Sequence, residues 1–312
     1  MKKTKAIAAV FSLVLAGLLW LVTSSGEAAN VKFTCNGKST IGNAVKKLKP
    51  GDTLSVTGTC NENLVIAEDI VRVVLDGQGK STIQGQDKTI PAVEVRGRGI
   101  TIKGFTVIGG RDGIVVNRGG QAIIDRNTVQ STARFGIQVN QSAFAAIANN
   151  TIQNNQSHGI NISGSSYASI GFLTGQDTTA SPNIIQENGQ NGIAVSRSSN
   201  ARIAGNRIRN NKLNGVMVSR ASQADISSST IEGNGMSGID VSQNSSVQLG
   251  ADKGEGIFQS ANTTTTENPQ VGIKCTINSS ADGRIGTLNG KSGAKDFEAT
   301  CVDSLITTAS VL

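Results

Sequence analysis

The sequence predicts an all-β protein that folds as a right-handed parallel β-helix, a solenoid of about 23 residues per turn with a short N-terminal capping helix. The first observation is a recurring tetrapeptide, Gly followed by two aliphatic residues with one variable residue between them. It returns at intervals of 23, 23, 33, 23 and 23 residues. The second observation is composition, because 37 glycines, four prolines and no helical periodicity favour short strands and turns. A repeat this short buries its apolar residues only by stacking on its neighbours. The repeated glycines are Gly113, Gly136, Gly159, Gly192, Gly215 and Gly238.

Other columns keep the same phase and give each turn three short strands. Two columns are aliphatic and should form ladders in a continuous interior. Two are mostly asparagine, and we expect these Asn and Gly positions to lie at corners that tolerate left-handed backbone geometry. The aliphatic columns are Ile124, Ile147, Ile170, Ile203, Ile226, Leu249 and Val129, Ile152, Ile185, Ile208, Ile231. The polar columns are Asn127, Asn150, Asn183, Asn206, Ser229 and Thr132, Asn155, Asn188, Asn211, Asn234.

Residues 1–28 have the layout of a secretory signal peptide. Three lysines precede an apolar run over residues 6–22, and Gly26 and Ala28 are the small residues that a cleavage site needs. An uncleaved anchor is the alternative, because a run of ~18 apolar residues can span a bilayer. After cleavage we expect an exported chain with no stable membrane insertion.

Residues 29–312 are expected to form a single β-helix domain. The N-terminal cap occupies about residues 31–60 and contains a short amphipathic helix, which covers the open end of the stack as edge protection requires. Its apolar face carries Ile41, Ala44, Val45 and Leu48. The opposite end occupies about residues 271–312.

Four cysteines remain after export, and an even number in an oxidising compartment suggests disulfides. Three connectivities are possible, but a rod would keep the two groups far apart. We therefore expect Cys35 to pair with Cys60 and Cys275 with Cys301. A metal site is the rival interpretation, and it lacks both CxxC spacing and histidines.

Two longer segments interrupt the period. Residues 172–182 follow the strand position of Ile170, and residues 251–269 follow the equivalent position of Leu249. Both should therefore protrude from the same side of the rod. They either line a binding face or are insertions that a surface tolerates.

The net charge is +7, and loss of the signal peptide leaves +5. A modest positive field favours polyanions such as an acidic polysaccharide, although solubility alone is the alternative explanation. No nucleic-acid partner is expected, because the arginines are dispersed and export removes that substrate. No feature of the sequence indicates an oligomeric state.

The repeat Asn-x-Ile-x-x-Asn-x-x-x-Gly-Ile-x-Val, with "VVLDGQGKSTIQG" at its N-terminal side, resembles the pectin-lyase-like superfamily. More closely, it is similar to exported bacterial right-handed parallel β-helix repeat proteins of the carbohydrate-binding and sugar-hydrolysis type. The resemblance covers roughly residues 31–302 and implies a periplasmic or extracellular bacterial protein. It leaves the activity open, because that superfamily includes lyases, hydrolases, epimerases and adhesins.

The stretch "SHGINISGS" is similar to the histidine motif of polygalacturonases, and "GRDGIVV" to their first aspartate motif. His158 and Asp112 would then share a column. The turn between them carries Arg134 and Phe135 where that family has paired aspartates, so one of the two carboxyl groups needed for glycoside hydrolysis is missing. We expect a variable, solvated column at this strand edge, formed by Asp112, Phe135, His158, Asn191, Asn214 and Ser237.

The candidate substrate-binding residues surround this column. Arg111 and Arg134 occupy equivalent positions on adjacent turns and could pair with uronate carboxylates, or they could form a solvated ridge. Their neighbours in the candidate site are Asp112, Gln138, His158 and Asn161. No stacking platform of Trp or Tyr is expected, because Trp20 leaves with the signal and only Tyr167 and seven phenylalanines remain.

No metal site or cofactor is expected. The outward column Val115, Gln138, Asn161, Ala194, Met217, Asp240 offers one carboxylate, whereas calcium needs several oxygen ligands. Asp252 and Glu255 give a weak calcium signal in the second insertion.

Three functions remain open at this point. The first is an exported β-helix that binds and possibly processes an acidic polysaccharide. The second is a non-enzymatic surface or structural interaction protein. The third is a polysaccharide lyase or epimerase with an atypical site. The sequence does not assign a catalytic residue for any of them.

Overall fold

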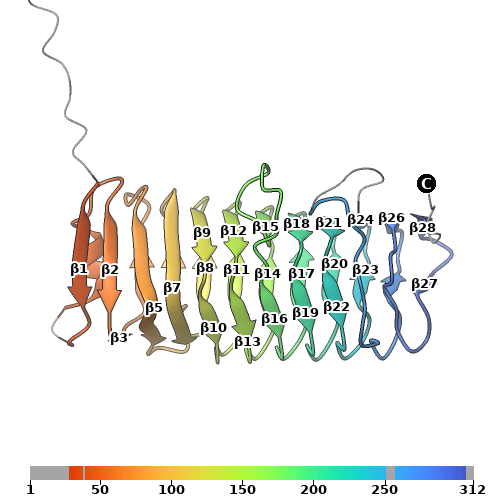
Figure 1. Ribbon diagram of the computed structural model, residues 1–312, viewed down its shortest axis with the longest axis horizontal. Coiled ribbons are helices and arrows are strands. Elements are labelled where there is room, and N and C mark those ends of the chain that lie inside the picture. The colour runs from red at the N-terminus through yellow and green to blue at the C-terminus, as the bar shows by residue number, and fades with distance from the viewer. Residues whose placement is uncertain (1–27, 38, 251–256, 307–312) are drawn as a thin grey trace, which may run out of the picture.

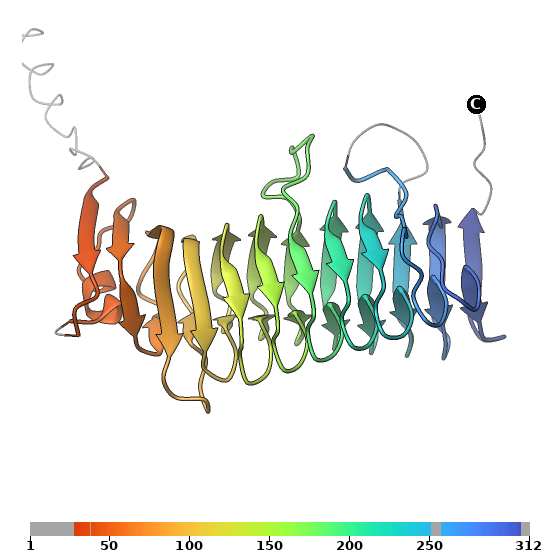
Figure 2. The same ribbon diagram turned by 60° about the horizontal axis from the view of Figure 1, so that its bottom comes forward.

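The computed structural model describes residues 28–37, 39–250 and 257–306 and shows a straight rod of stacked turns (Figures 1 and 2). Short strands at equivalent positions of successive turns pair in parallel, and most of them follow one another in three rows along the rod. These rows, named faces one, two and three, are the three sides of each turn. The predicted parallel β-helix is confirmed.

Within the described residues, face one has twelve strands, one for each turn. They are β1 (Asn30–Thr34), β2 (Thr53–Thr57), the first part of β5 (Val74–Gly85), the first part of β7 (Ile100–Gly109), β9 (Gln121–Asp125), β12 (Phe144–Ala148), β15 (Tyr167–Ile170), β18 (Asn200–Ala204), β21 (Gln223–Ser227), β24 (Ser246–Leu249), β26 (Ser280–Arg284) and β28 (Val302–Ile306).

Within each turn, face two comes after face one. Its first strand, β3, belongs to the second turn of the rod. It contains β3 (Thr59–Asn61), the second parts of β5 and β7, β10 (Thr128–Gln130), β13 (Thr151–Gln153), β16 (Ile184–Gln186), β19 (Arg207–Arg209) and β22 (Thr230–Glu232). Face three contains β4 (Leu64–Ile66), β6 (Val93–Val95), β8 (Ile114–Val116), β11 (Ile137–Val139), β14 (Ile160–Ile162), β17 (Ile193–Ser196), β20 (Val216–Ser219), β23 (Ile239–Val241), β25 (Ile273–Cys275) and β27 (Lys295–Phe297).

Two long strands bend around the corner between faces one and two. Residues 74–76 of β5 pair with β2, and residues 82–84 of the same strand pair with β3. The β5–β7 register shifts between Asp76 and Ser81, where the chain turns. Faces one and two are therefore joined in one 18-stranded sheet, while face three is a separate ten-stranded sheet.

The aliphatic columns predicted from the sequence fill the interior. Ile124 pairs in register with Ile147, which pairs with Ile170, and all three side chains are fully buried. The residues of face three that flank the outward position, such as Ile137 and Val139, are buried in the same way. Each turn thus stacks its aliphatic side chains on the equivalent side chains of the preceding turn, and these apolar ladders run along the rod.

The asparagine columns are buried ladders of hydrogen bonds. The backbone N–H and the amide Nδ2 of Asn150 both donate to Oδ1 of Asn183, at 2.9 and 3.0 Å, and Nδ2 also donates to the carbonyl of Ile124. The second column repeats this pattern from Asn155 to Asn188, and onward to Asn211. These amides satisfy corner groups that would otherwise lie buried without partners.

The expectation that the repeated Asn and Gly residues adopt left-handed geometry was wrong. The left-handed residues stand one position earlier, as Asn149 and Asn154 do with φ of 56° and 55°. The repeated glycines are required by close approach instead, because a Cβ at Gly136 would lie 2.6 Å from the carbonyl oxygen of Gly159.

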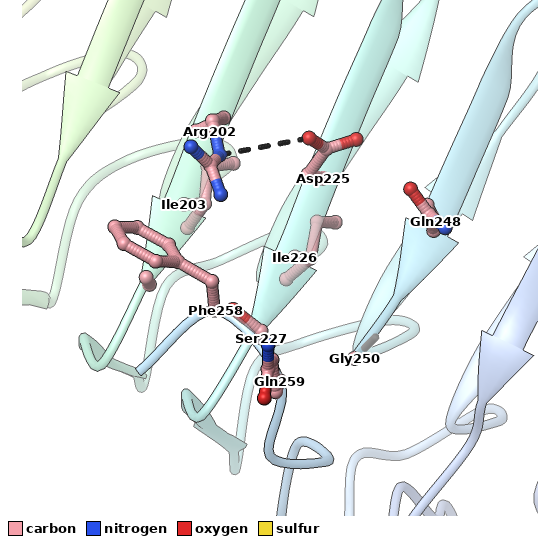
Figure 3. A pocket seen from close by; sticks show the side chains of 10 residues that line it. Arg202, Ile203, Asp225, Ile226, Ser227, Gln248, Gly250, Phe258 and Gln259 are labelled. Atoms are coloured by element: carbon pink, nitrogen blue, oxygen red, sulfur yellow. Dashed lines mark ion pairs between the residues drawn. The ribbon is translucent and has the colours of Figure 1, made fainter. Parts of the chain in front are cut away.

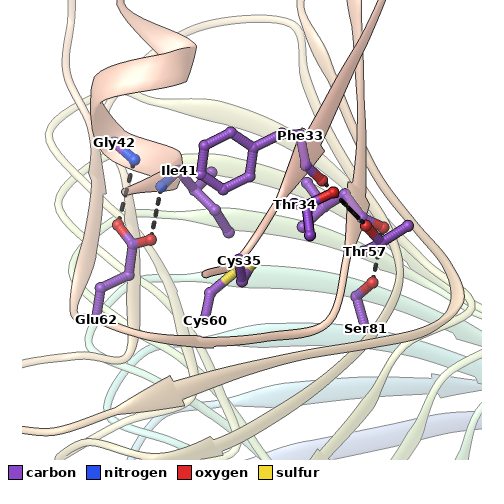
Figure 4. Close-up of a disulfide and its surroundings, with 10 residues drawn as sticks. Phe33, Thr34, Cys35, Ile41, Gly42, Thr57, Cys60, Glu62 and Ser81 are labelled. Carbon is purple, nitrogen blue, oxygen red and sulfur yellow. Dashed lines mark hydrogen bonds between the residues drawn. A yellow bond between two sulfur atoms is a disulfide. The ribbon is translucent and has the colours of Figure 1, made fainter. Parts of the chain in front are cut away.

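The N-terminal end carries the predicted helix, α1 (Ile41–Val45). Its Ile41 and Val45 are buried in the main core, and Ala44 and Leu48 pack against it, so the helix covers the first turns. Figure 4 shows how Glu62 holds the helix start, where Oε1 and Oε2 accept from the N–H groups of Ile41 and Gly42 at 2.6 and 3.2 Å. The predicted capping helix is confirmed.

Both predicted disulfides are present. Cys35 pairs with Cys60 beside the helix, with 5.1 Å between the Cα atoms (Figure 4). Cys275, at the end of β25, pairs with Cys301 just before β28, with 6.1 Å between the Cα atoms. The predicted signal peptide lies outside the described residues, apart from its last position.

Among the described residues, those of both inserted segments, 172–182 and the stretch that starts at residue 257, lie along the same edge of the rod, as predicted (Figures 1 and 2). They also contact each other, since the rings of Phe172 and Phe258 pack edge to face with centroids 4.8 Å apart. Asp252 and Glu255 lie outside the described residues.

Candidate functional site

The polar column at the start of face three is mostly buried. Asp112 and Ser237 are fully buried, and Asn191 and Asn214 are 2% and 5% exposed. Asp112, Asn191 and Asn214 each accept a backbone N–H of the next turn, as Asn191 Oδ1 does from the N–H of Asn214 at 2.9 Å, while Ser237 Oγ donates to Gln270 Oε1. The prediction of a solvated column was wrong, because these groups satisfy backbone donors at a corner.

Asp112 holds both arginines that the sequence singled out. Arg134 makes a two-pronged contact, from Nε to Oδ1 and from Nη2 to Oδ2 at 2.8 Å each, while Arg111 Nε reaches Oδ2 at 2.9 Å. The side chains of Arg111 and Arg134 remain 41% and 38% exposed. Asp112 is therefore a positioning residue that cannot itself meet a ligand, and much of the charge on the two guanidiniums is already neutralised.

His158 belongs to the same column through one ring nitrogen. Its Nδ1 accepts the backbone N–H of Asn191 at 3.2 Å. Because that N–H can only donate, the proton of the neutral ring is on Nε2. The ring stacks on Phe135 with centroids 5.4 Å apart, and burial lowers the pKa of His158 to about 4. At neutral pH the residue is an uncharged hydrogen-bond donor.

A groove of about 410 Å³ runs along face three from the turn of β11 to the turn that follows β23. Four of the six predicted binding residues line it: Arg134, Gln138, His158 and Asn161. Arg111 and Asp112 do not. The side chains of Gln138 and Asn161 form the floor as neighbours in register, and Gln138 Oε1 accepts from Arg134 Nη2 at 3.3 Å.

The opposite edge of the groove carries two further arginines. Arg197 and Arg220 follow β17 and β20, which pair in register through Ser196 and Ser219. Both arginines are exposed, and neither makes an ion pair with another described residue. One strand spacing of about 4.8 Å separates their turns. The groove thus has a paired guanidinium on one edge and two unpaired ones on the other.

Arg197 and Arg220 were not among the predicted binding residues. Each stands five residues after a repeated glycine, Gly192 and Gly215, so the phase of the repeat contains the signal. Both adopt left-handed backbone geometry, with φ of 58° at each, and both are exposed.

The described part of face three does not offer a metal cluster. No group of three or more His, Cys, Asp or Glu side chains gathers anywhere in the described residues. Asp240, on β23, is the carboxylate of the outward column, beside Lys274 in register. Burial raises the pKa of Asp240, and the amide of Asn214 lies 3.4 Å from Oδ2.

Face one carries a stacked pair of aromatic rings. Phe144 and Tyr167 pair in register on face one, and their rings stack with centroids 5.5 Å apart and an interplanar angle of 3°. Phe144 is 39% exposed. This pair lies on a different side of the rod from the arginine groove.

The two disulfides indicate an extracytoplasmic protein, because such bonds persist in oxidising compartments. In the described part of the chain, no helix has the length and apolar character needed to cross a membrane.

Solved structures with the same fold include three proteins that cover most of this chain. A pectate lyase matches at 13% identity and TM-score 0.54, over 88% of this chain and 81% of the lyase. A mutant periplasmic alginate epimerase matches at 13% identity and TM-score 0.53, over 87% and 83%. The A-module of a mannuronan C-5 epimerase from Azotobacter vinelandii matches at 12% identity and TM-score 0.51, over 90% and 92%. At these identities the likeness establishes the fold alone. A search of curated proteins found no match.

The family model described as right handed beta helix region matches residues 54–172, 91–250 and 161–282. These overlapping matches span 54–282, well over half of the chain, and establish the handedness that the sequence predicted. The chain belongs to the right-handed beta helix family.

Proposed function

We propose that the groove on face three binds an acidic polysaccharide. The observation that carries this proposal is the pair Arg197 and Arg220, two exposed guanidiniums on adjacent turns without an acidic partner among the described residues. A polyuronate presents carboxylates at regular intervals, and guanidinium groups bind carboxylates through paired charge-assisted hydrogen bonds.

The rest of the groove suits a polymer with many hydroxyl groups. Gln138, Asn161 and Ser163 supply amide and hydroxyl groups along the floor, and His158 adds an Nε2–H donor. Arg134 stands on the facing edge, fixed by Asp112. The solved neighbours are named as a pectate lyase and as mannuronan and alginate epimerases, which supports the same class of partner.

Binding is favoured over catalysis by the state of His158. A general base needs a free lone pair within reach of the substrate. The lone pair of His158 is used on the N–H of Asn191, and the ring nitrogen that remains is protonated. The groove lining has no carboxylate.

We propose a periplasmic or extracellular bacterial binding protein.

Affinity electrophoresis and titration calorimetry of residues 29–312 with polygalacturonate and alginate test the proposal. Arg197→Ala with Arg220→Ala should weaken binding by about tenfold or more, since each lost charge-assisted contact is worth about 1 kcal/mol or more. Binding should also weaken as salt is raised, because the arginines are exposed.

The matched control removes the same charge elsewhere. Lys47→Gln with Lys80→Gln changes two exposed residues outside the groove and should leave the affinity within about twofold. Equal weakening in both double variants would show a non-specific charge effect and would exclude the groove. Release of unsaturated products or new reducing ends by the unmodified protein, abolished in His158→Ala, would instead make the groove an active site.

A further inference from the structure

A second depression, of about 230 Å³, lies on face one beside the inserted loops (Figure 3). Its wall is built by the outward side chains of Arg202, Asp225 and Gln248, which pair in register on β18, β21 and β24. Phe258 and Gln259 of the second loop complete it. The depression is separate from the arginine groove, because it is on another face of the rod.

The loop residues of this depression are held in place. Ser227 Oγ donates to the carbonyl of Ile257 at 2.8 Å, and the N–H of Ser228 donates to the carbonyl of Ser260 at 2.8 Å. These bonds fix the short segment that contains Phe258 and Gln259 on both sides. A site whose parts are fixed in advance loses less entropy on binding than a mobile loop.

The aromatic ring of Phe258 is braced between two neighbours. The guanidinium carbon of Arg202 lies 3.9 Å from the centre of the ring, and Phe172 of the first loop packs against it edge to face. The two insertions therefore support each other and orient Arg202 at the rim. Cation–π contact and ring packing each stabilise such an arrangement.

The polar groups in the depression retain unused hydrogen-bonding capacity. Arg202 Nε and Asp225 Oδ2 are 3.7 Å apart, longer than the roughly 2.7–2.9 Å of a charge-assisted hydrogen bond. Gln259 Oε1 is buried and accepts no hydrogen bond from the described residues. A buried acceptor without a partner is unfavourable.

We propose that this depression binds one neutral sugar ring. A guanidinium, a carboxylate and two amides offer paired donors and acceptors that match neighbouring hydroxyl groups. The charges of Arg202 and Asp225 oppose each other, so a charged ligand gains little over a neutral one. A depression of about 230 Å³ has room for a single sugar ring. This inference does not depend on the arginine groove.

Side-chain amide signals in NMR spectra provide the test. The ¹⁵N-labelled chain is titrated with the methyl glycosides of glucose, galactose and mannose, and separately with galacturonate. At least one neutral glycoside should shift the amides of Gln248 and Gln259, and galacturonate should bind no more tightly than that glycoside. Because a hydrogen bond lost to a sugar hydroxyl costs about 1 kcal/mol or more, Gln248→Ala should weaken glycoside binding by about fivefold to tenfold.

Gln223→Ala is the matched control, since Gln223 is an exposed glutamine on the same face and outside the depression. It should bind the glycoside normally, as should the Arg197→Ala, Arg220→Ala variant, which separates this site from the groove. The proposal fails if no neutral glycoside shifts the two amides. It also fails if galacturonate binds more tightly than the glycosides, or if Gln248→Ala binds unchanged.

Discussion

At the scale of single residues, hydrogen-bond direction decides what His158 can do. The N–H of Asn191 takes the Nδ1 lone pair, which leaves Nε2–H toward the groove and keeps the ring neutral at physiological pH. Phe135 stacks on one side, and the guanidinium of Arg134 lies 4.3 Å from the centre of the Phe135 ring. The histidine is thus part of a supporting stack, and its free donor is available to a ligand.

The lowered pKa of His158 predicts a pH dependence of stability. In the unfolded chain the ring takes up a proton near pH 6.5, whereas in the folded chain it resists protonation until about pH 4. The unfolded state therefore binds more protons between these values, and the free energy of unfolding falls as the pH is lowered through this window. The full loss is on the order of 3 kcal/mol.

Urea unfolding of the mature chain and of His158→Gln, at steps between pH 7 and pH 4, measures this effect. Glutamine keeps an acceptor for the N–H of Asn191 but does not titrate. As the pH falls, the free energy of unfolding of the unmodified chain should decrease relative to that of the His158→Gln variant. If the free energies of unfolding of the two proteins change in parallel with pH, the assigned burial and tautomer of His158 are contradicted.

At the scale of elements, the strands are short, and the corners are held by side-chain ladders. Asn188 accepts from the N–H and Nδ2 of Asn155, and its own Nδ2 donates to Asn211 Oδ1 and to the carbonyl of Ile152. One buried amide thus serves groups on three turns. Such a network is stabilising only while every member has a partner.

Asn188→Ala should lower the free energy of unfolding by roughly 3 kcal/mol or more, because it leaves several buried donors and acceptors without partners. Asn200→Ala is the matched control, since Asn200 is exposed on face one at the start of β18, and it should change stability by no more than about 0.5 kcal/mol. Chemical unfolding of both variants checks the difference. Equal, small effects would mean that water replaces the missing amide at the corner.

The element scale also shows what the sequence could reveal. Columns that repeat every turn, such as Ile124 to Leu249, can be found by phase alone, because stacked turns bring equivalent residues into register. The same repeat also aligns Phe144 with Tyr167 and Arg197 with Arg220, but the residue counts alone did not indicate these pairs.

Burial of Asp112 could not be predicted, because it depends on how the next turn presents the N–H of Phe135 and the guanidinium of Arg134. The contact of Phe172 with Phe258 joins two insertions that have no period.

At the scale of the whole molecule, a rod of stacked turns has contacts only between neighbouring turns and two unlike ends. The N-terminal end is covered by α1, with Ile41 and Val45 inserted in the core. At the other end, the described part of the chain finishes with β28, which pairs with β26 and has Val302 60% exposed. Stability in such solenoids is a sum of local terms, so each end can open without the centre.

The disulfide of Cys275 and Cys301 should therefore act locally. It closes a loop with a sequence separation of 26, for which chain entropy predicts a contribution of about 3 to 4 kcal/mol. Replacing both cysteines with serine should speed hydrogen exchange in β25 to β28 and leave the central turns, β11 to β20, as protected as before. The Cys35→Ser, Cys60→Ser variant is the matched control, and it should affect β1 to β3 instead. Faster exchange along the entire rod in either variant would show that the turns unfold as one cooperative unit, and that the ends, and not the interior ladders, determine the stability of the molecule.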